Sequence, residues 1–111
     1  MRYFCFILSA SLSLAIASFP ASGNGNEYLL VIKDHRFEPS EVTIPAGTRV
    51  KLIVDNQDAS VEEFESHDLR LEKIIPGNSK ATIWVGPLKQ GKYRFVGEFH
   101  EDTAQGTLIS E

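Results

Sequence analysis

The sequence predicts an all-β fold, a Greek-key sandwich of about seven short strands, which follows a signal peptide. From residue 28 onward, short runs alternate between apolar and polar side chains, as half-buried strands do. Turn-forming sequences such as IPAGT, DNQDA and IPGNS separate these runs. The stretch NQDASVEEF is the one place where a turn or two of helix is expected. Short strands with regularly spaced turns are typical of a sandwich of two packed sheets.

The first 17 residues have the pattern of a secretory signal peptide. Arg2 supplies a positive charge, and an apolar run follows it. Ala15-Ile16-Ala17 is a small-x-small cleavage signal, and a second cleavage position follows Gly23. The run is shorter than the roughly 20 apolar residues that span a bilayer, so no stable membrane insertion is expected after cleavage. The sequence therefore predicts a signal peptide over residues 1–17, with cleavage as late as residue 23, and one domain over residues 24–111.

Seven segments are expected to form strands. One of them, RVKLIVDN, places Val50, Leu52 and Val54 on one face of the strand, as a half-buried strand requires. The aromatic residues, Trp84 among them, alternate with polar residues and are expected in the core. The expected strands cover residues 28–33, 40–47, 49–56, 63–71, 81–86, 92–99 and 106–110.

Charge and cysteine content narrow the class of function. The chain has 11 Lys and Arg against 15 Asp and Glu, a net charge of −4 at pH 7. An acidic domain without a basic patch argues against nucleic-acid binding, whereas it fits the attraction of cations or of a basic protein partner. The single cysteine, Cys5, lies in the predicted signal peptide. The domain that follows therefore has no thiolate for a disulfide or for a metal.

Two sequence motifs resemble those of the cupredoxins, the copper-binding β-sandwich proteins of the plastocyanin and azurin type. FEPSEVTIPAGTRVKLIVDN, residues 37–56, is similar to the family's opening pattern of a strand, a Pro-Ala-Gly turn and a second strand that ends in asparagine. GKYRFVG, followed by His100 and then GTLIS, is similar to the strand–loop–strand that carries most of the copper ligands. The resemblance covers the whole predicted domain and implies a cupredoxin-like Greek-key sandwich.

The same resemblance implies where the ligands of a blue-copper site would fall. The first histidine position holds Glu62, or Glu63 in the adjacent register, and His100 alone matches a histidine of the pattern. The cysteine position holds Gly97, and the methionine position holds Ala104. A type 1 copper ion needs a thiolate together with two imidazoles, so no type 1 copper centre is expected.

Three residues near these positions have the chemistry of a rebuilt metal site. Phe64 is expected to point inward, which places Glu62 on the same inner face of its strand. A carboxylate buried there needs a cation or a hydrogen-bond donor, and Glu98 and His100 lie on the facing loop. Glu62, Glu98 and His100 are therefore the candidate metal ligands. Carboxylate and imidazole ligands suit copper(II), iron(II) or manganese(II), with water completing the coordination.

The remaining acidic and histidine side chains are weaker candidates. Glu63 and Glu101 adjoin the candidate ligands in sequence. His67 lies on the expected outer face of its strand, where exposure to solvent is the simpler interpretation. His35 lies between two strands and is interpreted as an ordinary turn residue. The sequence EDTAQG also fits a plain acidic turn that binds no metal.

Three further motifs, EEFES, VGPLKQGKY and GEFHEDTAQGTL, resemble one branch of the family. They are similar to the small periplasmic cupredoxin-like proteins that accompany bacterial high-affinity iron permeases. This resemblance implies a periplasmic protein that binds copper or iron and assists ferrous iron uptake, with a membrane iron permease or another periplasmic uptake component as its partner. The alternative is a metal-free cupredoxin scaffold that docks a partner protein through its acidic loop end. An enzyme with independent turnover is the third alternative, after the metal-binding accessory and the metal-free scaffold.

Overall fold

The computed structural model describes residues 25–111, and no helix within this range is long and apolar enough to cross a bilayer. The predicted signal peptide and both predicted cleavage positions lie outside the described residues. Residues 25–111 form nine strands and one turn of 3-10 helix. The elements are β1 (Glu27–Lys33), β2 (Arg36–Glu38), β3 (Glu41–Ile44), β4 (Val50–Asn56), β5 (Glu62–Ser66), β6 (Leu71–Ile75), β7 (Ser79–Val85), β8 (Gly91–Gly97), the 3-10 helix η1 (Glu98–His100) and β9 (Gln105–Ser110).

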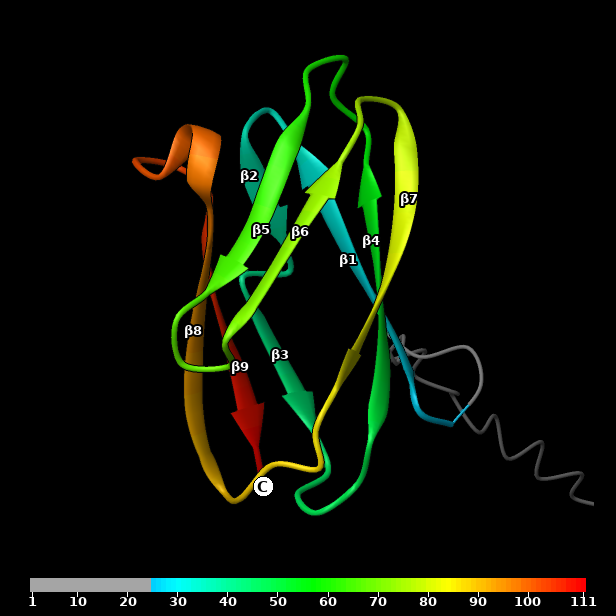
Figure 1. Cartoon of the computed structure of the whole chain (residues 1–111), viewed down its shortest axis with the longest axis vertical. Coiled ribbons are helices and arrows are strands. Elements are labelled where there is room, and N and C mark those ends of the chain that lie inside the picture. Colours follow the sequence, from blue (N-terminus) through cyan, green and yellow to red (C-terminus); the bar gives the residue numbers. More distant parts are fainter. Residues whose placement is uncertain (1–24) are drawn as a thin grey trace, which may run out of the picture.

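The strands form two sheets that pack face to face (Figure 1). The four-stranded sheet has the order β2-β1-β4-β7, and the five-stranded sheet has the order β3-β9-β8-β5-β6. β1 pairs with β4 in parallel and β3 pairs with β9 in parallel, whereas the other paired strands are antiparallel. The chain thus crosses from one sheet to the other at several of its connections. The predicted all-β sandwich is confirmed.

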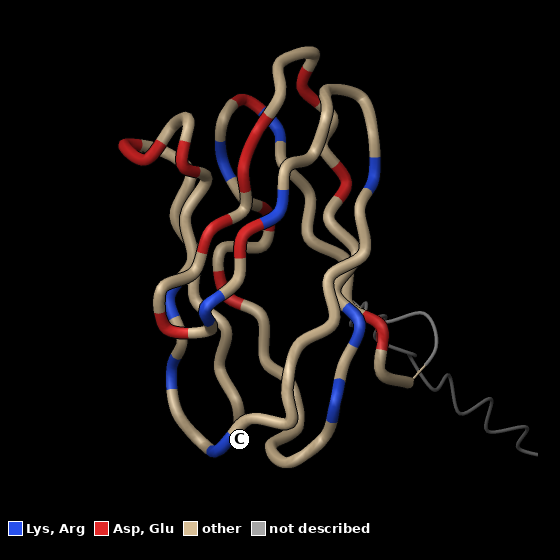
Figure 2. Tube along the Cα trace, viewed as in Figure 1, with Lys and Arg blue, Asp and Glu red and all other residues tan. Residues whose placement is uncertain are grey.

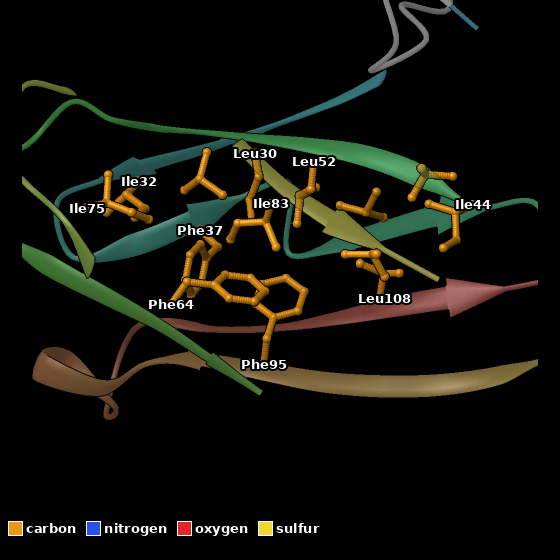
Figure 3. Packing of buried hydrophobic residues seen from close by; sticks show 14 of the residues in the cluster. Leu30, Ile32, Phe37, Ile44, Leu52, Phe64, Ile75, Ile83, Phe95 and Leu108 are labelled. Atoms are coloured by element: carbon orange, nitrogen blue, oxygen red, sulfur yellow. The ribbon is translucent and has the colours of Figure 1, made fainter. Parts of the chain in front are cut away.

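The core lies between the two sheets and is centred on three phenylalanine rings. Along β4, buried residues alternate with partly exposed ones, as predicted. The rings of Phe64 and Phe95 stack with their centroids 5.0 Å apart, and Phe37 meets Phe95 edge-on at 5.0 Å (Figure 3). Phe37 comes from the four-stranded sheet, and the other two rings come from the five-stranded sheet. These contacts therefore join the two sheets directly.

The expectation that the aromatic residues lie in the core is wrong for Phe99, in η1, and for Trp84, in β7. Trp84 lies on the outer face of its sheet. Its neighbours Ile83 and Val85 point inward from β7, and the pleat of the strand therefore sends Trp84 to the outer face. Its side chain is 49% exposed, and the guanidinium carbon of Arg49 lies 4.4 Å from the ring centroid. The guanidinium of Arg49 therefore makes a cation–π contact with the exposed ring.

Two expected elements also differ from the structure. The stretch expected to hold a turn of helix, residues 56–64, consists of the end of β4, a bend and the start of β5. The helical turn lies instead at η1, after β8. The expected strand over residues 63–71 is two strands, β5 and β6, because a turn at residues 67–70 reverses the chain. The three-residue strand β2 has no counterpart among the expected strands.

Gly106 is needed where β9 passes the aromatic core. It lies opposite Phe95 in the β8–β9 pair, and a Cβ atom at residue 106 would lie 2.3 Å from Cζ of that ring. The ring has no room to move in a packed core, so Gly106→Ala is expected to lower the free energy of unfolding by about 1–3 kcal/mol. Urea denaturation measures the change. Gln105→Ala, an exposed neighbour in the same strand, is the control, with an expected change within about 0.5 kcal/mol; equal effects would contradict this packing.

Four connecting segments meet at one end of the sandwich (Figure 1). They are the two-residue turn between β1 and β2, the loop of residues 57–61 between β4 and β5, the turn of residues 76–78 between β6 and β7, and η1 with the turn that follows it before β9. Asn56, fully buried at the end of β4, anchors the loop because its Nδ2 donates to the backbone oxygens of Ser60 and Ile75 at 2.9 and 3.1 Å. This end, called the loop end below, also carries many of the acidic residues (Figure 2).

Candidate functional site

Glu62 is a buried carboxylate at the loop end. The alternation along β5 buries Glu62, Phe64 and Ser66, as predicted, and leaves Glu63 and Glu65 partly exposed. Glu62 is 1% exposed, so its charge needs donors from the protein. The structure therefore settles the register in favour of Glu62 over Glu63 as the inward residue.

Three donors surround the Glu62 carboxylate. Oε1 accepts hydrogen bonds from the backbone N–H groups of Glu63 at 3.0 Å and Phe99 at 2.9 Å. Oε2 lies 2.7 Å from Nδ1 of His100. This arrangement follows from the strand register, because Phe64 pairs with Gly97 and antiparallel pairing then brings Glu62 opposite η1. Two of the three predicted ligands, Glu62 and His100, are thus in direct contact.

His35 stacks on His100, a contact that the sequence interpretation missed. The two imidazole rings have centroids 3.5 Å apart and planes only 11° apart. His35 does lie in the β1–β2 turn, as predicted, where it and Asp34 have left-handed φ angles of 57° and 53°. No sequence signal points to the stacking, because the β1–β2 turn and η1 are far apart in the chain.

Asp58 and Thr103 hold the turn that carries His35. The Asp58 carboxylate accepts the backbone N–H groups of Asp34 at 2.8 Å and His35 at 2.9 Å. Burial by itself raises the pKa of Asp58, but these hydrogen bonds and the nearby histidines outweigh it and hold the pKa below its usual value. The hydroxyl of Thr103 donates to the backbone oxygen of His35. The strained left-handed turn is therefore fastened from two sides.

Glu98, the third predicted ligand, is grouped with other carboxylates. Carboxylate oxygens of Glu98, Glu63 and Glu65 lie within 4.8 Å of one another. A hydrogen bond that protonated Glu63 donates to the Glu98 carboxylate, followed by desolvation and neighbouring negative charges, raises the pKa of Glu63. The three predicted ligands are therefore not all in direct contact. Glu62 is hydrogen-bonded to His100, whereas the carboxylate of Glu98 lies with those of Glu63 and Glu65.

A shallow hollow at the loop end nevertheless brings Glu98 and His100 to one surface. Its lining also contains His35 and the weaker candidate Glu101, which is exposed. The full lining is His35, Glu98, Phe99, His100, Glu101, Asp102 and Thr103. Two histidines and three acidic residues thus line the hollow.

His67 is separate from this hollow. Its side chain is 92% exposed, in agreement with the simpler interpretation, and its Nε2 lies 3.4 Å from a carboxylate oxygen of Glu65. An exposed pair of this kind contributes little to stability. His67 is therefore the natural control for experiments on the other two histidines.

Comparison with known proteins places the chain in a family. The family model described as cupredoxin-like domain matches residues 4–110. The chain belongs to the cupredoxin-like domain family. An uncharacterized protein of Rickettsia prowazekii (strain Madrid E) is 48% identical over 92 residues, a match that covers 81% of this chain and 74% of the relative.

Solved structures share the cupredoxin-like fold at low sequence identity. The metal-binding domain of the Streptococcus pneumoniae D39 Cu(I)-exporting P-type ATPase has a TM-score of 0.70 at 13% identity, covering 81% of this chain and 90% of that one. A copper-binding protein in its apo form has a TM-score of 0.69 at 16% identity, covering 81% and 92%. Auracyanin A, a blue copper protein from Chloroflexus aurantiacus, has a TM-score of 0.66 at 16% identity, covering 77% and 98%. At these identities the likeness shows the fold alone.

A type 1 copper ion does not fit this cupredoxin-like domain. A Cβ atom at Gly97 would lie 2.7 Å from Cδ of Glu62 and 2.7 Å from Cβ of Ala104. The Glu62 carboxylate therefore occupies the space that a cysteine side chain at position 97 would need. Residues 97 and 104 supply no sulfur, and the carboxylate already has donors on both oxygens. In this chain a hydrogen-bonded glutamate–histidine pair occupies the interior of the site.

Proposed function

We propose that this cupredoxin-like protein is a periplasmic accessory of iron uptake that binds a divalent copper or iron ion in the hollow at the loop end. One observation carries the metal-binding part. His100 lines the hollow and uses Nδ1 for Glu62, while its Nε2 makes no hydrogen bond with any residue in the range 25–111. A partly exposed histidine in a hollow lined by acidic residues is a typical start for a metal site.

The ligand set would combine nitrogen and oxygen donors. His100 would supply Nε2, and Glu98 and Glu101, which line the same hollow, would supply carboxylate oxygens, with water completing the coordination. Such ligands favour copper(II) and iron(II) over copper(I), which prefers sulfur. The three solved structures compared above are all named for copper, which makes copper the first metal to test.

The role in iron uptake rests on sequence motifs and on charge. EEFES, VGPLKQGKY and GEFHEDTAQGTL resemble the cupredoxin-like components of iron permease systems, and the predicted signal peptide agrees with a periplasmic location. The net charge of −4 and the acidic loop end would raise the local concentration of cations. The partner would be a membrane iron permease or another periplasmic uptake component, and loss of ferrous iron uptake on deletion of this protein would support that assignment.

Calorimetric titration of the metal-stripped protein with copper(II) and iron(II) tests metal binding. One site is expected, and His100→Ala is expected to weaken it at least about tenfold because a primary ligand is lost. His67→Ala is the matched control, since this histidine is exposed and lies outside the hollow. Weak binding at many sites, equal in the wild type and both variants, would contradict the proposed metal site.

A second function is favoured by the exposed aromatic ring at the loop end. Phe99 is 49% exposed within η1, beside the carboxylates of Glu98 and Glu101. An apolar ring in an acidic setting fits a docking surface on a metal-free scaffold for a basic partner protein. In that case Phe99→Ala would weaken binding of the partner, whereas His100→Ala would change metal binding no more than the His67→Ala control does.

A further inference from the structure

We infer that Glu62 is a positioning residue that sets the tautomer of His100, so that Nε2 is the nitrogen presented to a metal in the hollow. The part of this inference that concerns a bound metal rests on the proposed function. The part that concerns the tautomer of His100 rests on the geometry alone. The inference changes the role of Glu62, which the sequence predicts to be a metal ligand.

The tautomer follows from the hydrogen-bonding capacity of the two groups. An ionised carboxylate only accepts hydrogen bonds, so Nδ1 of His100, 2.7 Å from Oε2 of Glu62, carries a proton. In the neutral form of this imidazole, which has a single N–H group, Nε2 therefore keeps its lone pair. A lone pair on a ring nitrogen is what a metal ion binds.

The carboxylate is held in place from its other side. Oε1 accepts the backbone N–H groups of Glu63 and Phe99, so a rotation of the carboxylate would break two hydrogen bonds. The glycine at position 97 leaves the space that the carboxylate fills, because a Cβ there would lie 2.8 Å from Oε2. Glu62 is therefore fixed as an acceptor directed at His100.

The ring of His100 is also held in its plane. His35 stacks against it with ring centroids 3.5 Å apart, and Asp58 holds the backbone of His35. The backbone of His100 is held as well, because its oxygen accepts the N–H groups of Thr103 and Ala104 at 3.1 and 2.8 Å and so closes the bend after η1. The hydrogen bond from Nδ1 and the stacked ring together fix the direction of Nε2.

A carboxylate that orients a histidine in this way is a general device of metal sites. The carboxylate accepts the N–H of one ring nitrogen, fixes the ring and makes the other nitrogen a better ligand, and loss of the carboxylate weakens metal binding about 10–100-fold. Glu62 is 1% exposed and has this relation to His100 without facing the solvent itself. The acidic residues of the hollow are then free to act as ligands, while Glu62 acts through His100.

Glu62→Gln separates positioning from packing. The glutamine has nearly the same shape, and its oxygen keeps the two backbone N–H groups, but its NH₂ group then donates to Nδ1 of His100. The proton of the imidazole would move to Nε2, the nitrogen meant for the metal. The tautomer of His100 is read from long-range ¹H–¹⁵N correlations in the metal-free protein at neutral to mildly alkaline pH. The Nδ1–H form is expected in the wild type and the Nε2–H form in Glu62→Gln.

The same variant is expected to bind copper(II) about 10–100-fold more weakly than the wild type in the calorimetric titration. Glu63→Gln, a change of the same kind one residue along β5, is the control and should leave the tautomer of His100 unchanged. His35→Phe keeps an aromatic ring against His100 and should leave the tautomer unchanged as well.

The outcomes separate this inference from the proposed function. An Nε2–H form of His100 in the wild type would overturn the inference whether or not a metal binds. Equal copper affinity of the wild type and of a Glu62→Gln protein with the altered tautomer would also overturn it. The expected tautomers in a protein that binds no metal would support the role of Glu62 in orienting His100, while the proposed metal-binding function would fail.

Discussion

Glu62→Ala is expected to lower the free energy of unfolding by about 3 kcal/mol, because it leaves buried donors without an acceptor. The donors are the backbone N–H groups of Glu63 and Phe99 and the Nδ1–H of His100. Removing the side chain also opens a space beside Gly97, where the carboxylate now lies. Since small domains are stable by about 5–15 kcal/mol in total, the loss would be a large fraction of the stability. Urea denaturation of both proteins in the presence of a chelator measures it without a contribution from metal.

Two variants show whether the loss comes from the missing acceptor. Glu62→Gln keeps the acceptor for the two backbone N–H groups and is expected to lose less than half as much stability as the alanine variant. Glu101→Ala, an exposed glutamate of the same end, should change stability by no more than about 0.5 kcal/mol. A stability of Glu62→Ala equal to that of the wild type would contradict a structural role for the Glu62–His100 pair.

Phe95→Ala is expected to lower the free energy of unfolding by about 3–5 kcal/mol, the usual range for a phenylalanine removed from a core. Phe95 is 1% exposed, stacks on Phe64 and meets Phe37 edge-on, so its loss opens a cavity where the two sheets join. Because strands from both sheets line this cavity, the surroundings are poorly placed to collapse into it. Denaturant unfolding measures the loss. An unchanged m-value would show that both proteins expose the same surface on unfolding, so that the shift of the midpoint reports stability alone.

Phe99→Ala is the matched control for this prediction. Phe99 follows β8 by two residues, and its ring is 49% exposed. Removing it is expected to change the free energy of unfolding by no more than about 0.5 kcal/mol. If the two phenylalanine variants lost similar amounts of stability, the central position of Phe95 in the core would be contradicted.

The sequence by itself determined the fold class and the burial of Glu62. A strand has a period of two, so alternation in RVKLIVDN and around Phe64 assigns each side chain to the inner or outer face without knowledge of any partner strand. The same period also implies that Trp84 points outward between Ile83 and Val85, whereas the opposite expectation treated Trp84 as alternating with polar residues, although both of its neighbours are apolar. The sequence did not predict the turn at residues 67–70, because this turn contains neither glycine nor proline.

Only the tertiary structure decided which side chains of the loop end meet. Periodicity places residues on faces, but it does not say which of the loops at one end of a sandwich come into contact. His35 reaches His100 because the β1–β2 turn is fastened to Asp58 and Thr103, and no local pattern records that contact. Likewise, Glu98 follows β8 directly but joins the cluster of Glu63 and Glu65, since the exact pairing of β5 with β8 sets which carboxylates are adjacent. Periodicity therefore places Glu62 on the inner face of β5, whereas the partners of Glu62 and His100 depend on contacts between segments distant in the chain.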